Sequence, residues 1–308
     1  MRRLGLSYLR PTSGGCPLTV RCPVCDATSP VTRFTQGTAR IVQCQACGLL
    51  YTDPPISGEY YQALQRQDLF DEMRAAATER MNVYTSAVRT IDCLNIDRER
   101  WRILDVGCGM GLFLCAATAY GYDCYGIEAS ETQAAWCRQL RLNVRYDNRA
   151  NAFDPQTFHV VTMLDVLEHI ARPKAILASI WNVLQPGGYL LARVPNGPYN
   201  LWKARALQRF RPGVDFVGAG EHVAHFSAST ISTLLTSMGY QVVAIRSAQN
   251  DMGKRPMERI KRGVASALAS VGDLLRLPLG ASLLAVARRP RIDARSARTD
   301  QETGAPDE

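Results

Sequence analysis

The stretch from Ile103 to Leu112 reads ILDVGCGMGL, and it decides the fold that the sequence predicts. An apolar run ends at Asp105, and glycines follow at alternate positions, Gly107, Gly109 and Gly111. This order is typical of a parallel strand that turns sharply into a helix, where glycines let the backbone approach a nucleotide. The spacing differs from the G-x-G-x-x-G of dinucleotide-binding turns, and a carboxylate beside the first glycine would repel phosphates. The stretch therefore indicates a nucleotide-type ligand that has no phosphate next to the glycine turn.

A second acidic residue supports this interpretation. Glu128 ends the next apolar run, YGIEA, seventeen residues beyond Gly111. An acidic side chain at the carboxyl end of the second strand accepts hydrogen bonds from both ribose hydroxyls in nucleotide-binding folds. Asp105 would suit a ligand that carries an ammonium and a sulfonium. S-adenosylmethionine has both cations and a ribose, so the two carboxylates and the glycine turn together favour this cofactor.

From Arg102 onward, short apolar runs alternate with helical patterns, which is typical of an α/β fold with a parallel sheet and crossover helices. Pro186-Gly187-Gly188 predicts a helix stop and a tight turn before the fifth strand. Helices are predicted over residues 111–120, 130–141, 174–184 and 228–238, and a further helical pattern runs from Glu59 to about Ile96. Strands are predicted over residues 102–107, 123–128, 143–147, 158–164, 188–194, 240–247 and 282–288.

Residues 102–290 resemble the class I S-adenosylmethionine-dependent methyltransferases, in the broad group that methylates small molecules. The blocks that carry the resemblance are ILDVGCGMG, YGIE, HVVTMLDVLEHIARP, VLQPGGYLLARVPN and EHVAHFSASTISTLL. The resemblance implies a seven-stranded, doubly wound Rossmann-like sheet with the last strand antiparallel. It also implies that the cofactor lies at the carboxyl ends of the first two strands. The cofactor-binding residues that it implies are Asp105, Gly107, Gly109 and Gly111 for the methionine part, Glu128 for the ribose, Asp147 near the adenine, and Asp165.

Four of the ten cysteines have the spacing of a metal site. Cys22 and Cys25 form one C-x-x-C pair, and Cys44 and Cys47 form a second pair after eighteen intervening residues. Two such turns, brought together by a hairpin of the strands VTRF and ARIVQC, make the tetrahedral four-sulfur site that zinc prefers. A closed site of this kind has no open coordination position, so the expected zinc is structural. The module resembles the zinc-ribbon segment that precedes some of these methyltransferases.

The sequence therefore predicts an N-terminal tail, a zinc-ribbon-like module, a helical lid or linker, a class I methyltransferase domain and a C-terminal tail. The expected bounds are 1–15, 16–57, 58–98, 99–290 and 291–308. Within the methyltransferase domain, residues 250–278 predict an amphipathic insertion whose basic residues cluster at one end. We expect this helix to pack on the domain, and peripheral contact with an anionic surface is the alternative.

Composition restricts the class of protein. A chain of 308 residues with 46% hydrophobic and 21% charged residues is ordinary for a soluble globular protein. Much of the net charge of +8 lies in runs at residues 254–262 and 288–298, which are typical of solvated segments. No apolar segment is long enough to span a bilayer, and the apolar stretch that ends at Arg10 is too short for a signal peptide. We therefore expect a cytoplasmic protein with thiols or metal ligands rather than disulfides.

The histidines are the candidates for a general base, because a hydroxyl acceptor must lose a proton. His225 is the first choice, since HFS leads from a loop beside the expected acceptor site into the next helix. His169 is second, because Glu168 and the strand end fix its position, and His222 is the third candidate. His159 opens a strand and is expected to be structural. The H-x-x-H spacing could also suggest a metal, but no further ligand cluster in the sequence supports it.

The preferred function is transfer of a methyl group from S-adenosylmethionine to an oxygen of a sugar-derived or secondary metabolite. An RNA methyltransferase of the zinc-containing ribosomal type is the alternative, favoured by the basic charge and the cysteine module. The basic runs lack the interleaved aromatic residues that stack on bases, so a nucleic acid is not the expected partner. A cofactor-binding module without catalysis is a third hypothesis, which the complete set of glycines and carboxylates disfavours.

Overall fold

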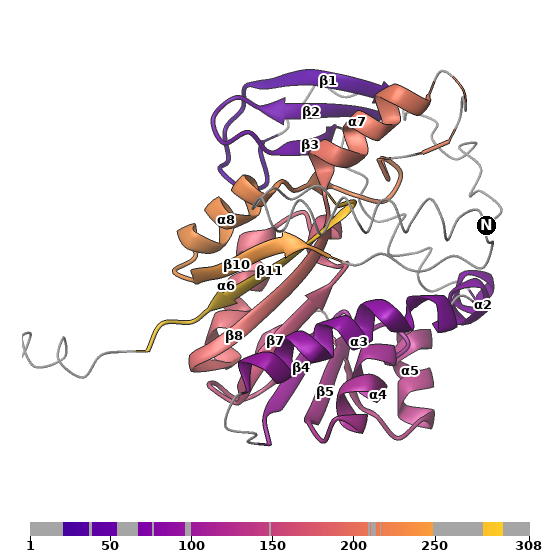
Figure 1. Ribbon diagram of the computed structural model, residues 1–308, viewed down its shortest axis with the longest axis vertical. Helices are drawn as coiled ribbons and strands as arrows, with labels where there is room; N and C mark the ends of the chain where they lie inside the picture. Colours follow the sequence, from indigo (N-terminus) through magenta and orange to yellow (C-terminus); the bar gives the residue numbers. More distant parts are fainter. Residues whose placement is uncertain are drawn as a thin grey trace, which may run out of the picture.

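The computed structural model describes residues 21–36, 39–53, 67–75, 77–95, 100–147, 149–208, 210, 214–215, 217–248 and 280–291. These residues form two sheets, one of seven strands and one of four, with helices against both (Figure 1). The predicted N-terminal tail, the C-terminal tail from residue 292 onward and the amphipathic insertion at 250–278 lie outside the described residues.

The larger sheet has the strand order β10-β11-β8-β7-β4-β5-β6. Its strands β4 to β8 pair in parallel, whereas β11 is antiparallel to both β8 and β10. This order confirms the predicted seven-stranded, doubly wound fold with an antiparallel last strand. The strands are β4 (Arg102–Val106), β5 (Asp123–Glu128), β6 (Asn143–Tyr146), β7 (Phe158–Leu164), β8 (Leu184–Pro195), β10 (Gln241–Ser247) and β11 (Ser282–Arg288).

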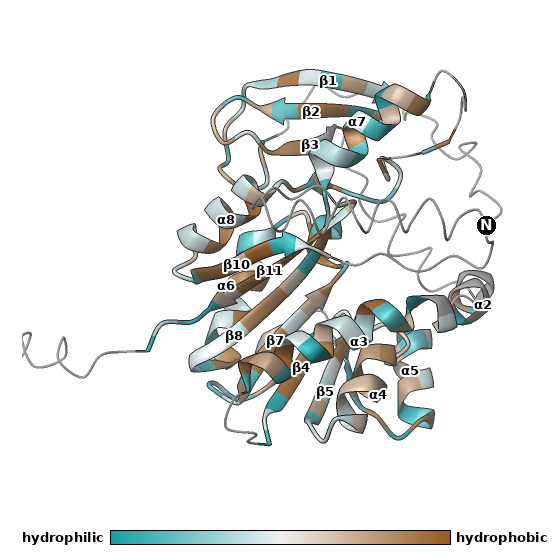
Figure 2. Cartoon of the chain, viewed as in Figure 1, coloured by the Kyte–Doolittle hydropathy of each residue, from teal (hydrophilic) through white to brown (hydrophobic). Residues whose placement is uncertain are grey.

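Alternate residues of each central strand enter the two hydrophobic layers that cover the sheet. Ile103 of β4 packs with the helices α3 (Ala77–Leu94), α4 (Leu112–Ala119) and α5 (Glu131–Gln139), while its neighbour Leu104 faces α6 (Pro173–Val183) and α8 (Ala228–Ser237). Because both faces are covered, the central strands contain long apolar runs, seen as the brown segments of β4, β7 and β8 in Figure 2. The helical segment expected as a lid or linker thus contributes α3 to the core of the domain, and α2 (Gln67–Ala75) precedes it.

Local signals explain where the helices begin. Ser227 and Thr230 form a reciprocal capping box at the start of α8, and Pro173 occupies the first turn of α6, where its missing N–H costs nothing. None of the helices in the described part of the chain combines the length and hydrophobicity needed to cross a membrane.

Two segments differ from the sequence-based expectation. The helix α6 ends at Val183 and β8 begins at Leu184, so the expected turn at Pro186-Gly187-Gly188 lies inside the strand, where the β7–β8 register shifts. Gly187 adopts a φ of 86° there and donates its N–H to the carbonyl of Arg289 at 2.8 Å. The helix α7 (Gly197–Leu207) was not predicted.

The smaller sheet has the order β1-β2-β3-β9 and is antiparallel throughout. The expected hairpin is confirmed as β1 (Pro30–Gln36) and β2 (Ala39–Cys44). The third strand, β3 (Leu50–Asp53), was not predicted, and it pairs with the two-residue β9 (Ala224–His225) of the methyltransferase part. The cysteine module therefore extends its sheet into the larger domain.

The two sheets share one hydrophobic core. Ile41 and Leu50 face α7, whereas their neighbours Val42 and Tyr51 face the opposite side of the small sheet. On that side Val42, Tyr51 and the fully buried Leu49 belong to the same buried cluster as α6, α8 and the central strands. The cysteine module is therefore held by apolar burial as well as by strand pairing.

Replacing Leu49 by alanine should lower the free energy of unfolding by about 2–5 kcal/mol, because it leaves a cavity between the two sheets. Val243 on β10 is 50% exposed, so Val243→Ala should change stability by less than about 0.5 kcal/mol. Denaturant titration of both variants measures the difference. Equal stabilities of the Leu49→Ala and Val243→Ala variants would show that the cysteine module does not share the core of the larger domain.

Candidate functional site

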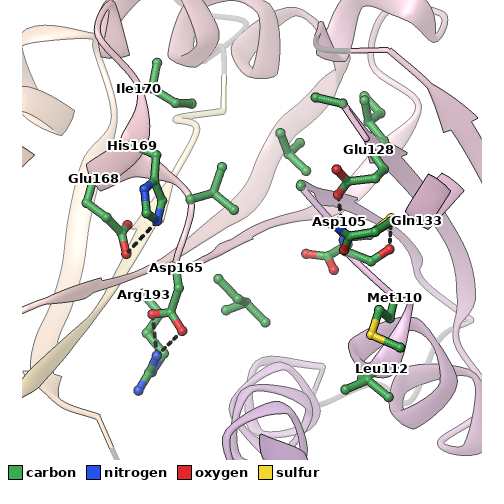
Figure 3. A pocket seen from close by; sticks show the side chains of 18 of the residues that line it. Asp105, Met110, Leu112, Glu128, Gln133, Asp165, Glu168, His169, Ile170 and Arg193 are labelled. Atoms are coloured by element: carbon green, nitrogen blue, oxygen red, sulfur yellow. Dashed lines mark hydrogen bonds and ion pairs between the residues drawn. The ribbon is translucent and has the colours of Figure 1, made fainter. Parts of the chain in front are cut away.

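A cavity of about 580 Å³ opens at the carboxyl ends of the parallel strands. This volume is within the range of small-molecule sites. Its walls come from α2 and α3, the glycine turn after β4, the ends of β5, β7 and β8, and the loop before β9. Figure 3 shows two groups of polar side chains facing each other across it, with Asp105 and Glu128 on one side and Asp165, Glu168 and His169 on the other. We refer to these as the glycine-turn side and the histidine side.

The glycine turn is held against β5 by its backbone. The N–H groups of Gly107 and Cys108 both donate to the carbonyl of Ile127, at 2.8 and 3.0 Å. Gly107, Gly109 and Gly111 all have positive φ, and the first two line the cavity. Gly111 is not among the lining residues. A Cβ there would lie 2.4 Å from a methyl group of Leu142, so this glycine allows α4 to pack closely instead.

Glu128 links the turn to the end of β5. Its Oε2 accepts the N–H of Gly109 at 2.7 Å, and its Oε1 accepts the N–H of Ser130 at 2.7 Å. Burial raises the pKa of this carboxyl, while the backbone N–H groups act in the opposite direction. A carboxylate offers about four acceptor sites, so both oxygens keep capacity for ligand hydroxyls.

Asp105 is buried at the end of β4 and lines the same side of the cavity. Thr162 of β7 donates its hydroxyl to Asp105 Oδ1 at 2.6 Å. Burial raises the pKa of Asp105 to about 7, opposed by the Thr162 hydrogen bond and reinforced by the charge of Glu128. A cation in the cavity would favour the ionised form of this carboxyl.

The other two predicted cofactor residues, Asp147 and Asp165, lie on different sides of the cavity. Asp147 lines the cavity near Glu128, whose carbonyl accepts the Asp147 N–H at 3.1 Å. Asp165 lies across the cavity on the histidine side, where it forms an ion pair with Arg193 (Figure 3). It also forms an ion pair with Arg80, 3.1 Å away. The structure thus groups Asp165 with the expected acceptor region rather than with the glycine turn.

His169 and His222 lie side by side on the histidine side, with their ring centroids 4.9 Å apart. His169 Nδ1 lies 2.9 Å from the carbonyl oxygen of Glu221, and His222 Nδ1 lies 3.2 Å from that of Val217. Burial lowers the pKa of His169 to about 4, with His222 adding to the effect, and burial also lowers the pKa of His222. Both imidazoles are therefore neutral near pH 7.

His225, the first-choice base from the sequence, has a different environment. It is 3% exposed, is not among the residues that line the cavity, and pairs with Leu50 in the β3–β9 ladder. Thr52 donates its hydroxyl to the carbonyl of His222 at 2.7 Å and lies 3.0 Å from His225 Nε2. Since the hydroxyl proton goes to the carbonyl, His225 Nε2 donates to Thr52. The structure places His225 in the junction between the two sheets, so His169 and His222 are the histidines that face the cavity.

Glu168 is a buried carboxyl beside His169. It is 1% exposed, and its Oε1 lies 3.9 Å from His169 Nε2. Burial raises its pKa well above the usual range, and the charge of Asp165 adds to this. Its second oxygen, Oε2, has no hydrogen-bond partner among the described residues.

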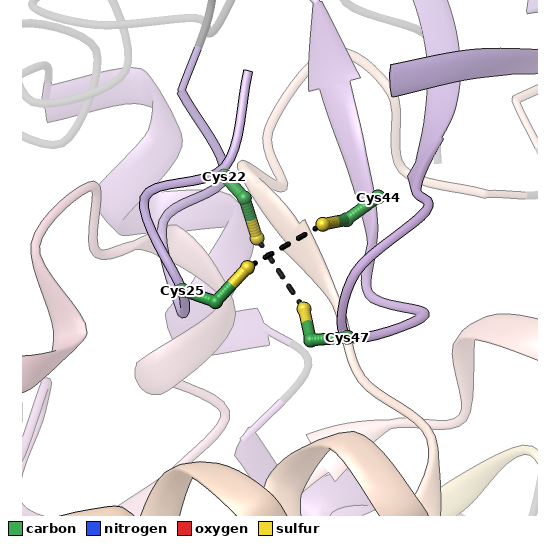
Figure 4. Close-up of side chains that lie close together, drawn as sticks. All are labelled: Cys22, Cys25, Cys44 and Cys47. Atoms are coloured by element: carbon green, nitrogen blue, oxygen red, sulfur yellow. Dashed lines mark hydrogen bonds between the residues drawn. The ribbon is translucent and has the colours of Figure 1, made fainter. Parts of the chain in front are cut away.

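The four predicted zinc ligands converge away from the cavity (Figure 4). The sulfur of Cys22 lies 3.5 Å from that of Cys47, and the sulfur of Cys25 lies 3.4 Å from that of Cys44. All four sulfurs lie within 4.8 Å of one another. In a tetrahedral zinc site with bonds of about 2.3 Å the sulfurs are about 3.8 Å apart, so the cluster could hold one ion.

Several cavity residues were missed from the sequence. Arg193 interrupts the apolar strand LLARVP, and a charge inside a buried strand was the available signal. Arg80 and Tyr84 come from α3, and Gln133 comes from α5. Nothing in the local pattern of these helices separates the residues that face the cavity from those that face solvent.

Comparison with known proteins supports the same fold. The sequence matches the methyltransferase-domain family over residues 65–245. A ubiquinone biosynthesis O-methyltransferase of Methylococcus capsulatus is 36% identical over 95 residues, which cover 28% of this chain and 40% of that protein. The chain thus matches less than half the length of this curated relative.

Two solved structures share the fold at low identity. A chain in the complex of the Haloferax volcanii Trm112 methyltransferase activator with a methyltransferase has a TM-score of 0.53 and 16% identity, covering 77% of this chain and 100% of that one. The plantazolicin methyltransferase BpumL, solved with S-adenosylhomocysteine, has a TM-score of 0.50 and 16% identity. The match covers 75% of this chain and 94% of BpumL. The family match spans more than half of the sequence and includes the glycine turn, Glu128 and the histidine side up to β10, so the chain belongs to the methyltransferase-domain family.

Proposed function

We propose that the protein transfers a methyl group from S-adenosylmethionine to a hydroxyl oxygen of a small molecule. The observation that carries this proposal is the two-sided cavity. Carboxylates that suit a cationic nucleoside line one side, and neutral imidazoles line the other. The name of the Methylococcus capsulatus relative supports an oxygen acceptor.

The glycine-turn side fits the cofactor in its polar groups. Asp105 would hold the ammonium of the methionine part, and Glu128 would accept the ribose hydroxyls with the lone pairs that its two N–H partners leave available. Gln133 Oε1 is buried, finds no partner in the described part of the chain, and would accept a further hydrogen bond from the bound cofactor. Asp147, which lines the cavity near Glu128, would approach the adenine.

When bound, S-adenosylmethionine supplies a methyl group on a sulfonium that is a good leaving group. The chain's own residues must then position the acceptor and take its proton as the oxygen forms its bond to carbon. His169 and His222 are neutral and face the cavity, so they are the imidazoles available for this task. His225 would support them indirectly, by holding the loop that carries His222 against β3.

The charges on the histidine side restrict the acceptor. The guanidinium groups of Arg80 and Arg193 both pair with Asp165, and Glu221 also lines this part of the cavity. N–H donors of this kind would favour an acceptor with several oxygens. A sugar-derived or secondary-metabolite acceptor is consistent with this chemistry and stays a prediction.

We further propose that Cys22, Cys25, Cys44 and Cys47 bind one structural zinc ion. The convergence of four sulfurs supports this proposal. The ion would fix the turns at one end of the small sheet, which docks on the methyltransferase core through β3 and Leu49.

Affinity for S-adenosylhomocysteine should rise about tenfold between pH ~6 and pH ~8. Asp105 has a pKa of about 7, so it is mainly protonated at the lower pH and ionised at the higher, and only the carboxylate attracts the ammonium. The Asp105→Asn variant should bind S-adenosylhomocysteine weakly at both pH values. The exposed control Asp154→Asn should behave as wild type. Calorimetry at several pH values measures this. A pH-dependence that persists in Asp105→Asn would reject the role of Asp105.

One sulfur-coordinated zinc should be present per chain, and Cys44→Ser should remove it and lower the melting temperature. The control is Cys93→Ser, which changes an exposed thiol on α3. X-ray absorption at the zinc edge distinguishes sulfur ligands from nitrogen and oxygen. Freshly purified, reduced protein without sulfur-bound zinc would rule out the site.

Labelled S-adenosylmethionine should transfer its methyl group to a member of a pool of hydroxylated small molecules and not to RNA. His169→Ala should lower kcat by ~10²–10⁴-fold while binding S-adenosylhomocysteine normally, because losing a positioned base has an effect of this size. His159→Ala is the matched control, since His159 stacks on Trp101 and is not among the cavity residues. Labelling of RNA alone, or a full rate in His169→Ala, would contradict the proposal.

A further inference from the structure

The cysteine module has no assigned part in the proposed methyl transfer, and yet its strand β3 ends beside the histidine side of the cavity. β3 pairs with β9, and the residues just before β9 carry His222 into the cavity. Within this junction Thr52 is fully buried, and His225 is 3% exposed. Two polar side chains therefore meet in a junction whose other paired residues are buried and hydrophobic.

The pairing register explains why these two side chains meet. His225 stands opposite Leu50, and Thr52 follows Leu50 by two residues along β3. Side chains two residues apart on a strand point to the same face, so Thr52 and His225 are diagonal neighbours. Thr52 Oγ1 accepts the Nε2–H of His225 at 3.0 Å and donates its own proton to the carbonyl of His222 at 2.7 Å. One hydroxyl of the cysteine module thus holds this segment at two points.

Backbone hydrogen bonds continue from this junction to the second cavity histidine. Thr52 donates its N–H to the carbonyl of Val223 at 3.0 Å, and Val223 donates its N–H to the carbonyl of Glu168 at 2.9 Å. Glu168 lies in the short turn after β7 that also carries His169. The Nδ1 of His169 lies 2.9 Å from the carbonyl oxygen of Glu221. A chain of hydrogen bonds therefore runs from β3, through the loop before β9, to both imidazoles that face the cavity.

The end of β9 is also fixed by α7. Gly197, the first residue of α7, donates its N–H to the carbonyl of Phe226 at 2.8 Å. A Cβ at Gly197 would lie 2.5 Å from the carbonyl oxygen of His225, so glycine is required for this close approach. β9 is therefore held between β3 and α7, and the position of the loop before it depends on both.

The polar pair in this junction suits a positioning role better than a purely stabilising one. Folding exchanges hydrogen bonds to water for internal ones, so apolar side chains of similar shape could stabilise the junction as well. Hydrogen bonds have preferred distances and directions, and they therefore fix where the loop lies. Burial lowers the pKa of His225 to about 3, with His222 adding to the effect, so the ring stays neutral and its hydrogen bond is constant near pH 7.

We propose that Thr52 is a positioning residue, through which the cysteine module holds His222 and His169 where they would take the acceptor's proton. The glycine-turn side is held by β5 and β7 instead, through the hydrogen bonds of Glu128 and Thr162. Cofactor binding should therefore not depend on Thr52. The effect on turnover rests on the proposed methyl transfer, whereas the effect on the two imidazoles does not.

The test is ¹⁵N NMR of histidine-labelled protein, in which the chain gives signals from only 4 imidazoles. Thr52→Val removes the hydroxyl and nearly keeps the shape of the side chain. In this variant the pKa of His222 and of His169 should rise toward the ordinary value of about 6.5, because a loosened loop exposes both rings to water. Titratable groups near His222 are unchanged in this variant, namely Glu168, His169, Glu221, His225, Asp165 and Asp215.

Two further variants serve as controls. Thr52→Ser keeps the hydroxyl and should keep the wild-type pKa of both rings. Thr90→Val should also leave them unchanged, because Thr90 is a buried threonine on α3 that bonds the carbonyl of Ser86 and is not among the cavity residues. If the unpaired His225 prevents Thr52→Val from folding, the double variant Thr52→Val/His225→Phe decides the matter, since replacing both polar partners by apolar groups can be nearly neutral.

Kinetics and cofactor binding separate positioning from a general loss of structure. Folded Thr52→Val should bind S-adenosylhomocysteine with wild-type affinity, while kcat for the acceptor found with labelled S-adenosylmethionine should fall by ~10²-fold. Wild-type imidazole pKa values in folded Thr52→Val, or equal shifts in Thr52→Ser or Thr90→Val, overturn the inference. Cofactor affinity that falls as far as kcat overturns it as well. If wild type transfers no methyl group, shifted imidazole pKa values still support the positioning role, and only the proposed function fails.

Discussion

The parallel pairing of β4 with β5 on one side and with β7 on the other brings the carboxyl ends of three strands to one edge of the sheet. Asp105, Glu128 and Asp165 follow from that pairing, since each stands at or just after a strand end. The strands are buried on both faces, so a shift of register by one residue would turn their apolar side chains away from the layer that each one fills. The carboxylates are thereby held in place by the core, of which Ile127 and Leu164 also line the cavity.

Charge is distributed unevenly across the cavity. The glycine-turn side carries the buried carboxyl groups of Asp105 and Glu128, whose partners are the Thr162 hydroxyl and backbone N–H groups, and this would suit a cationic cofactor. The histidine side carries two guanidinium groups paired with Asp165, neutral imidazoles, and the side chains of Glu168 and Glu221. Under the proposed function, this difference would favour the methyl donor on the glycine-turn side and the acceptor on the histidine side.

The small sheet is part of this arrangement rather than an appendage. Its strand β3 pairs with β9, and Thr52 bonds both the carbonyl of His222 and the ring of His225. The loop that carries His222 into the cavity is therefore held from the cysteine module. Loss of the module's structure would be expected to disturb the histidine side before the glycine turn.

The sequence by itself determined the α/β class, the seven strands of the larger sheet, the glycine turn with Asp105 and Glu128, and the pairing of the cysteines. These features depend on local periodicity and short spacings, which a single chain displays directly. The turn inside β8 was misjudged because proline and glycine there resemble loop signals, and the helix α7 was not predicted. Only the tertiary structure decided which histidines face the cavity, because His225 and His222 are separated by two residues and yet point into different environments. It also brought Arg193, Arg80 and Glu168 together, since contacts between distant segments depend on how strands and helices pack and not on any pattern within one of them.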